Sequence, residues 1–198
     1  PCVLISNEVQ FIEGTRLSSV STDNFTAASH SADYLIQMGH TRIGVIGGDL
    51  GGSGITQRRY DGFLSSLTKA GLGFDYGKAY ATAKYSFEDG ARAAERLMGS
   101  YPDMTAIFAM SDVMAIGAIR RLADMGRKVP DDVSVIGFDG IPLSSYYQPR
   151  LATIRQETDL LADEGLNILL NMIERNAPPE NKFIPFEFIP GESVRRLA

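Results

Sequence analysis

The stretch 105-TAIFAMSDVMAIGAIRRLADMGRKVPDDVSVIGFDG-140 decides the fold class of this chain. Thr105–Ala109 and Val133–Phe138 are almost continuous apolar runs, as expected for parallel strands that are buried on both faces. The segment between them carries an apolar stripe with helical spacing. An acidic residue follows each strand, Asp112 after the first and Asp139 after the second. Because open α/β sheets bind ligands at the carboxyl ends of their strands, this stretch predicts a small-molecule site.

The rest of the chain also alternates strands with helices, which predicts an α/β protein with parallel sheets. Further strands are expected at Cys2–Ser6, Ser18–Ser21, Ile43–Ile46, Lys78–Lys84, Leu151–Gln156 and Phe183–Ile189. Pro185 interrupts the last of these, which indicates an edge strand.

The glycine-rich run Gly47–Gly54 suggests how the chain divides into lobes. Too little strand precedes Gly47 to complete a sheet, whereas residues 48–150 can form one unaided. We therefore predict two lobes joined by three crossovers that form a hinge. Residues 1–47 and 154–178 would form an incomplete N-terminal lobe, and residues 48–153 and 179–198 the C-terminal lobe.

The composition is that of a soluble globular protein: of 198 residues, 44% are hydrophobic and 22% are charged. A net charge of −5 provides no electrostatic footprint for nucleic acid. Cys2 is the single cysteine, so no internal disulfide can form and a reducing, cytoplasmic compartment is expected. No apolar run approaches the length of a membrane span. The chain starts within an expected strand, which we interpret as the start of a fragment.

A set of motifs in unbroken order indicates a family. They are Asp23-Asn24, Gly39-His40, Arg42–Gly47, Arg59–Phe63, Ser111-Asp112, Val129–Asp139 and Pro149–Gln156. With them the sequence resembles the effector-binding core of the LacI/GalR-type bacterial transcriptional regulators. The resemblance implies a periplasmic-binding-protein-like fold of two doubly wound parallel-sheet lobes, a homodimer, and an effector in the interlobe cleft. That family's helix-turn-helix, hinge helix and first βα units have no counterpart here, so operator DNA would be bound only through the absent domain.

The resemblance also implies a set of ligand-binding residues. They are Asp23, Asn24, Arg59, Tyr85, Ser111, Asp112 and Asp139. Sugar hydroxyls both donate and accept, so carboxylates and a guanidinium suit them, and an aromatic ring can stack on the sugar. Hydrogen bonds to charged groups contribute roughly 1.5–3 kcal/mol each. Three or four of them support micromolar binding, on the order of −8 kcal/mol.

Each of these residues also has a purely structural interpretation. Asp139 precedes Gly140, and Asp-Gly is a common turn dipeptide. Arg59 could be a solvated surface residue or the partner of Asp139, and Tyr85 could be a partly buried residue at the rim. The residues at strand-to-helix junctions could simply cap the following helix, namely Asp23, Asn24, Ser111 and Asp112. Ser111 stands where many sugar-responsive members carry Asn, which leaves the identity of the effector open.

Other kinds of site find less support. The run Gly47–Gly54 does not meet either phosphate-loop pattern, and His30 and His40 have no partners at metal-ligand spacing, so we expect no cofactor and no metal. The sequence therefore predicts a non-enzymatic, sugar-responsive regulator core. The alternatives are a periplasmic sugar-binding protein of an ABC transporter and, less well supported, an enzyme on a doubly wound sheet.

Overall fold

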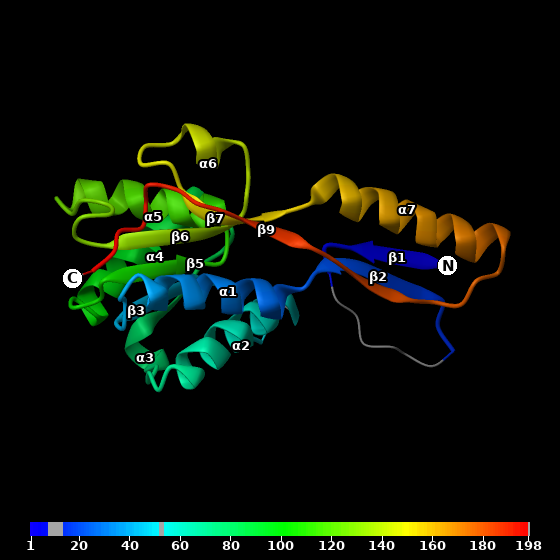
Figure 1. Ribbon diagram of the computed structural model, residues 1–198, viewed down its shortest axis with the longest axis horizontal. Coiled ribbons are helices and arrows are strands. Elements are labelled where there is room, and N and C mark those ends of the chain that lie inside the picture. The colour runs from blue at the N-terminus through cyan, green and yellow to red at the C-terminus, as the bar shows by residue number, and fades with distance from the viewer. Residues whose placement is uncertain (8–13, 52–53, 198) are drawn as a thin grey trace.

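A computed structural model describes residues 1–7, 14–51 and 54–197, and in it the chain forms two lobes, each built on its own sheet (Figure 1). The smaller lobe holds a parallel three-stranded sheet of β1 (Cys2–Ile5), β2 (Leu17–Thr22) and β8 (Asn181–Ile184). Helix α7 (Thr158–Glu174) packs on this sheet through a small apolar core that includes Leu161, Ile168 and Met172.

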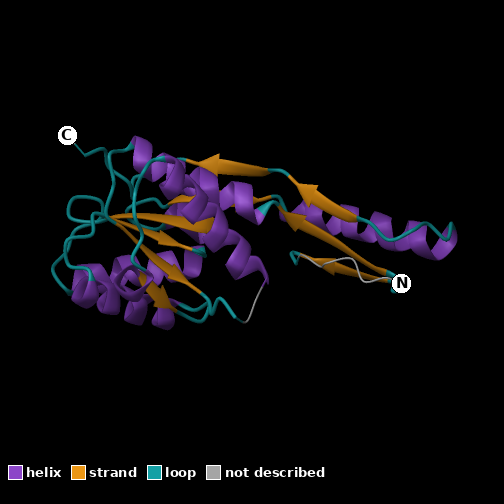
Figure 2. Cartoon of the chain, turned by 90° about the horizontal axis from the view of Figure 1, so that it is seen from below, coloured by secondary structure: helices purple, strands orange, loops and turns teal. Residues whose placement is uncertain are grey.

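The larger lobe holds a six-stranded sheet in the order β4-β3-β5-β6-β7-β9. Its strands are β3 (Ile43–Gly47), β4 (Tyr80–Thr82), β5 (Ala106–Ala109), β6 (Ser134–Asp139), β7 (Ala152–Gln156) and β9 (Phe186–Ile189). All neighbours are parallel except β9, which runs antiparallel to β7. Helices cover both faces of this sheet (Figure 2). They are α1 (Asn24–Gln37), α2 (Gly54–Lys69), α4 (Phe87–Ser100) and α5 (Asp112–Asp124), with the short helices α3 (Tyr76–Ala79) and α6 (Leu143–Tyr146).

Helices α1 and α5 begin at capping residues that the sequence predicts, and α4 begins at a further cap, Ser86. The side chains of Asp23, Ser86 and Ser111 each accept a hydrogen bond from a backbone N–H in the first turn of the following helix. Gly126 has a φ of 74°, the left-handed conformation expected of a residue that ends a helix. These local signals confirm the predicted α/β class. No helix among the described residues is long and apolar enough to cross a bilayer.

The predicted lobe boundary at Gly47 is wrong. Strand β3 pairs with β4 and β5 in the larger sheet, so residues 43–47 do not belong to the smaller lobe. The chain instead crosses between the sheets after Thr22, after Gln156 and at Pro185. The glycine run connects β3 to α2 within one lobe, and its residues 52 and 53 lie outside the described part. Glycine content marks a loop, but only long-range strand pairing decides which sheet the loop serves.

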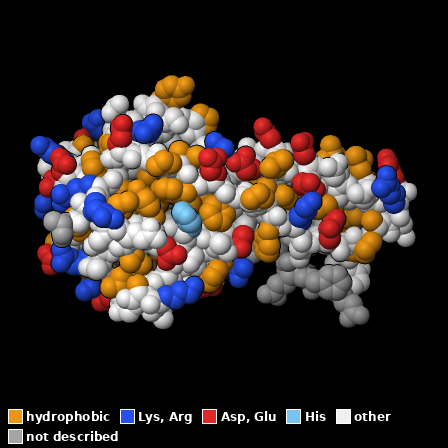
Figure 3. All heavy atoms as spheres, in the orientation of Figure 1, with side chains coloured by type: hydrophobic (Ala, Val, Ile, Leu, Met, Phe, Trp, Pro, Cys, Tyr) orange, Lys and Arg blue, Asp and Glu red, His pale blue; other side chains and the backbone are white. Residues whose placement is uncertain are grey.

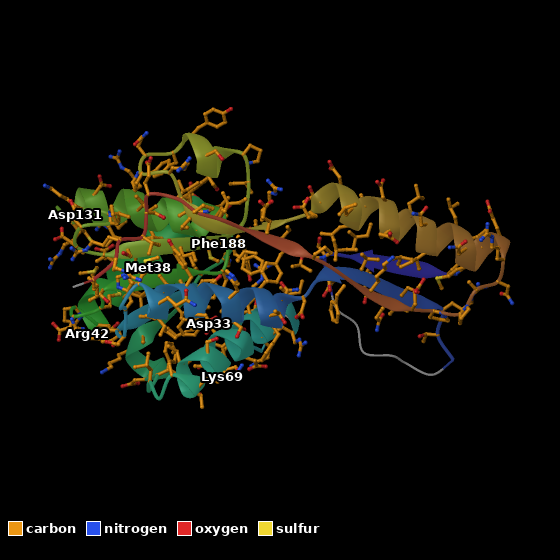
Figure 4. All side chains as sticks on the ribbon, in the orientation of Figure 1. Asp33, Met38, Arg42, Lys69, Asp131 and Phe188 are labelled. Atoms are coloured by element: carbon orange, nitrogen blue, oxygen red, sulfur yellow. The ribbon has the colours of Figure 1, made fainter. Side chains whose placement is uncertain are left out.

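The expected strand Phe183–Ile189 is two strands. Pro185 has no N–H to donate to a ladder, and the chain changes sheets there. Strand β8 ends the small sheet and β9 ends the large one, so both halves lie at an edge as the proline indicates. Phe188 of β9 lies against α1, with its ring centroid 4.5 Å from that of Tyr34 (Figure 4). Hydrophobic side chains surround a histidine on this face (Figure 3), where His30 contacts Phe188, so β9 is held firmly to the large lobe.

Candidate functional site

The carboxyl ends of both parallel sheets meet at the junction of the lobes. Strand β2 ends at Thr22 and the chain passes directly into the large lobe, while β7 ends at Gln156 and passes into the small lobe (Figure 1). Strand β6, beside β7, ends at Asp139. This is the edge at which open α/β sheets bind ligands.

Five residues at this junction form a connected set, which we call the hinge network. Its members are Thr22, Asn24, Arg59, Asp139 and Gln156. They come from two strand ends of the large sheet, one strand end of the small sheet, and the helices α1 and α2. Residues far apart in sequence are thus brought together by the way in which the two sheets are joined.

Arg59 is a buried charged member of the hinge network, at 5% exposure. Its Nε donates to Asn24 Oδ1 at 2.9 Å, and its Nη1 donates to the Met110 carbonyl at 2.5 Å. The guanidinium carbon lies 3.6 Å from the centroid of the Phe138 ring. These contacts fix the guanidinium plane, and Nη2 lies 3.8 Å from Asp139 Oδ1. The cation is therefore positioned without depending on a ligand.

Asp139 combines burial with access to solvent. Its side chain is 29% exposed, and its Oδ1 accepts a hydrogen bond from Gln156 Nε2 at 2.8 Å. Burial raises the pKa of Asp139 to about 6, against the opposing effect of Arg59, and the negative charge of Asp112 adds to the rise. Its φ of 117° is uncommon for a residue with a side chain. Partial dehydration and an uncommon backbone conformation together are typical of functional positions.

Asp112 has a different environment from the one that ligand binding requires. It is fully buried, its Oδ1 accepts from Thr153 Oγ1 at 2.6 Å, and its Oδ2 accepts from Ser144 Oγ at 2.7 Å and Ile141 N at 2.9 Å. Burial raises its pKa, and these hydrogen bonds oppose the rise. The geometry therefore favours the structural alternative, in which Asp112 attaches the loop after β6 to β7.

The remaining expected residues divide between capping and exposure. Asp23 caps α1, where its carboxylate accepts from Thr26 N at 3.1 Å, and Ser111 is a buried cap of α5. Asn24 is buried and holds Arg59. Tyr85 is 48% exposed, and its hydroxyl lies 3.0 Å from Thr56 Oγ1. The structure thus joins Asn24, Arg59 and Asp139 directly, whereas Tyr85 presents a ring farther along the same sheet edge.

Sequence reasoning missed Thr22 and Gln156. Thr22 Oγ1 donates to Gln156 Oε1 at 2.9 Å, which connects the first crossover to the second. A signal for Gln156 is present in the sequence, because it is a polar residue at the end of an expected strand, the pattern that identified Asp139. Thr22 carries no such signal, because β2 itself consists mostly of serine and threonine.

Comparison with known proteins agrees with this geometry. Residues 32–194 match the family described as the periplasmic binding protein-like domain. The chain is 35% identical over 198 residues to the HTH-type transcriptional repressor CytR of Escherichia coli K12, covering 100% of this chain and 57% of CytR. It is 32% identical over 177 residues to the repressor PurR of Haemophilus influenzae Rd, covering 89% of this chain and 52% of PurR. The chain thus spans little more than half the length of these relatives.

Solved structures show the same fold. The complex of the transcriptional regulator CelR with cellobiose superposes with a TM-score of 0.88 at 27% identity, covering 94% of this chain and 57% of CelR. A LacI family regulator from Enterococcus faecium with bound ribose gives a TM-score of 0.85 at 27% identity, covering 96% and 69%. A two-lobed α/β chain with strand ends facing the junction is thus a periplasmic-binding-protein-like ligand domain. More narrowly, the chain belongs to this family as the effector-binding core found in LacI-type transcriptional regulators.

Proposed function

We propose that the chain is the effector-sensing part of a sugar-responsive transcriptional regulator, which binds an uncharged polyol between the lobes. The observation that carries the proposal is the pairing of Arg59 with Asp139 at the junction. Nη2 and Oδ1 are 3.8 Å apart, so a positively charged donor and a negatively charged acceptor lie side by side there. Arg59 donates and Asp139 accepts, which matches the two roles of a hydroxyl group.

Tyr85 and the pre-set position of Arg59 support the same proposal. The exposed Tyr85 ring provides an apolar surface on the large lobe for the face of a sugar ring. Because Asn24 and the Met110 carbonyl already hold the guanidinium, little side-chain entropy is lost when a ligand binds. The related CelR structure contains cellobiose and the Enterococcus faecium structure contains ribose, which favours a sugar for this chain.

Signalling would follow from closure of the lobes. A ligand that contacts both lobes binds the closed arrangement more tightly than the open one and shifts the equilibrium by that difference in affinity. Because the relatives are DNA-binding repressors, the changed lobe angle would alter operator binding through a domain that lies outside these residues. The protein would act in the cytoplasm and without catalysis.

A thermal-shift and calorimetric screen of sugars, sugar phosphates and nucleosides tests the proposal. Asp139→Asn should weaken binding of a sugar hit at least about tenfold, the loss of one charge-assisted hydrogen bond. Asp124→Asn is the matched control, because Asp124 pairs with Arg120 at 3.0 Å on the surface of α5. The proposal is contradicted if Asp139→Asn and Asp124→Asn bind the sugar with equal affinity. It is also contradicted if only phosphorylated compounds bind.

We also propose that the protein is a homodimer in which α4 and α5 meet a second copy. A groove of about 430 Å³ lies there, lined by Phe87, Ile116, Arg120 and Tyr147 among others. The adjacent Tyr146 is 84% exposed, and clustered apolar surface of this kind is typical of protein interfaces. Tyr147→Glu should shift the sedimentation equilibrium to monomer, whereas Tyr76→Glu, on α3, should leave it unchanged.

A further inference from the structure

The side chain of Gln156 links the ligand-binding carboxylate to the hinge itself. Its Nε2 donates to Asp139 Oδ1 at 2.8 Å, and its Oε1 accepts from Thr22 Oγ1 at 2.9 Å. Thr22 is the last residue of β2 before the first crossover, and Gln156 is the last residue of β7 before the second. One planar amide therefore touches both crossovers and the carboxylate.

The chemistry of the three groups requires a glutamine in this orientation. An ionised carboxylate can only accept, so it takes the NH₂ end of the amide. The carbonyl end then faces Thr22, whose hydroxyl has to donate. A glutamate would place a second carboxylate against Asp139, and a leucine of similar size would make neither bond.

The strand ladders also join the crossovers, through Thr22 with Ile184 and Gln156 with Phe186, but each ladder stays within one sheet. The ion pairs near the crossovers lie on the surface. Arg155 pairs with Glu157 at 3.1 Å and with Glu187, and its side chain is 45% exposed. Exposed ion pairs of this kind contribute little to stability. Arg155 is the strand neighbour of Asp139, but the side chain that donates to the Asp139 carboxylate is that of Gln156.

We propose that Gln156 couples occupation of Asp139 to the angle between the lobes. The proposal rests on the proposed function in assuming that an effector binds at Asp139. Rotation about the crossovers changes the separation of Thr22 and Gln156, so their hydrogen bond restrains it. A hydroxyl that binds Asp139 reorients the carboxylate, the amide follows, and the restraint at Thr22 changes.

Interlobe distances measured by double electron–electron resonance test the coupling without an effector. Spin labels are placed at Glu174→Cys, the last residue of α7, and at Lys69→Cys, which points outward from α2 (Figure 4), in a Cys2→Ser background. Labelled protein is diluted with unlabelled protein so that only distances within one chain contribute. Gln156→Leu should broaden the distance distribution about twofold, because the hinge loses a restraint.

Two variants and a control sharpen the result. Thr22→Val removes only the hydroxyl donor, should broaden the distribution similarly, and should add little when combined with Gln156→Leu. Gln57→Leu is the matched control, because Gln57 Nε2 also donates to an aspartate, Asp61, at 2.8 Å, but within one helix of one lobe. It should leave the distribution at the wild-type width.

The decisive measurement is the response to Asp139→Ala, which removes the acceptor of the Gln156 amide. In the wild-type background this substitution should shift the mean distance, and in the Gln156→Leu background the shift should disappear. The proposal is overturned if Gln156→Leu or Thr22→Val keeps the wild-type width of the distance distribution, or if the effects of the two substitutions simply add. It is also overturned if the shift in mean distance is unchanged in the Gln156→Leu background. A failed sugar screen would instead count against the proposed function alone, because these measurements need no ligand.

Discussion

Asp139→Asn should make the protein more stable while it weakens effector binding. The substitution keeps the shape of the side chain and removes a charge that the fold partly dehydrates. Burial raises the pKa of Asp139 from 3.8 to about 6, with Arg59 opposing the rise. Each pH unit corresponds to about 1.4 kcal/mol, so the ionised carboxylate costs the folded state about 3 kcal/mol at pH 8. The amide escapes this cost and still accepts from Gln156.

The difference in stability between Asp139→Asn and wild type should depend on pH. The unfolded carboxyl ionises near pH 3.8 and the folded one near pH 6, so wild-type stability falls as pH rises through this window and is level above it. The advantage of Asp139→Asn should therefore be largest at pH 8 and should vanish near pH 4. For a chain of this size it corresponds to a rise in Tm of about 6–12 °C.

Calorimetric melting of both proteins between pH 4 and pH 8 measures this difference. Asp124→Asn, on the surface of α5, should change Tm little at any pH. If Asp139→Asn melts at or below the wild-type temperature at pH 8, or if the difference does not vary with pH, the carboxylate is not strained by burial and the reasoning fails.

Three further predictions concern the large lobe. Burial lowers the pKa of His40 below 6.5, so its contribution to stability is present above pH 6.5 and is lost as pH falls. In urea unfolding, the free energy of unfolding should therefore decrease less between pH 7.5 and pH 5.5 for His40→Gln than for wild type. Gly62→Ala should lower the free energy of unfolding by about 3 kcal/mol or more, because the new Cβ would lie 2.1 Å from the Phe25 carbonyl oxygen. Gly99→Ala, whose Cβ would have no atom within 4 Å, should instead stabilise α4 by up to about 1 kcal/mol. Asp112→Ala should lower the free energy of unfolding by about 2–4 kcal/mol, since two buried hydroxyls and one partly buried N–H lose their acceptor. An unchanged urea midpoint would contradict the structural role.

Local signals in the sequence determined the elements and part of the site. Apolar runs at β5 and β6 predicted buried parallel strands, and Asp23 and Ser111 cap helices as their positions predict. The placement of Asp139 at a strand end follows from the same local pattern. These features depend on residues close in sequence, so composition and spacing are sufficient to find them.

Only the tertiary structure decided which sheet each strand joins and which polar groups meet. Strand β3 belongs to the large sheet, and the chain changes sheets at Pro185. The Asp112 carboxylate accepts hydrogen bonds from donors within the protein. The contact of Gln156 with Thr22 joins residues 134 positions apart. Strand pairing and side-chain contact are long-range, and their energy depends on the packing of the whole lobe, so no local pattern contains them.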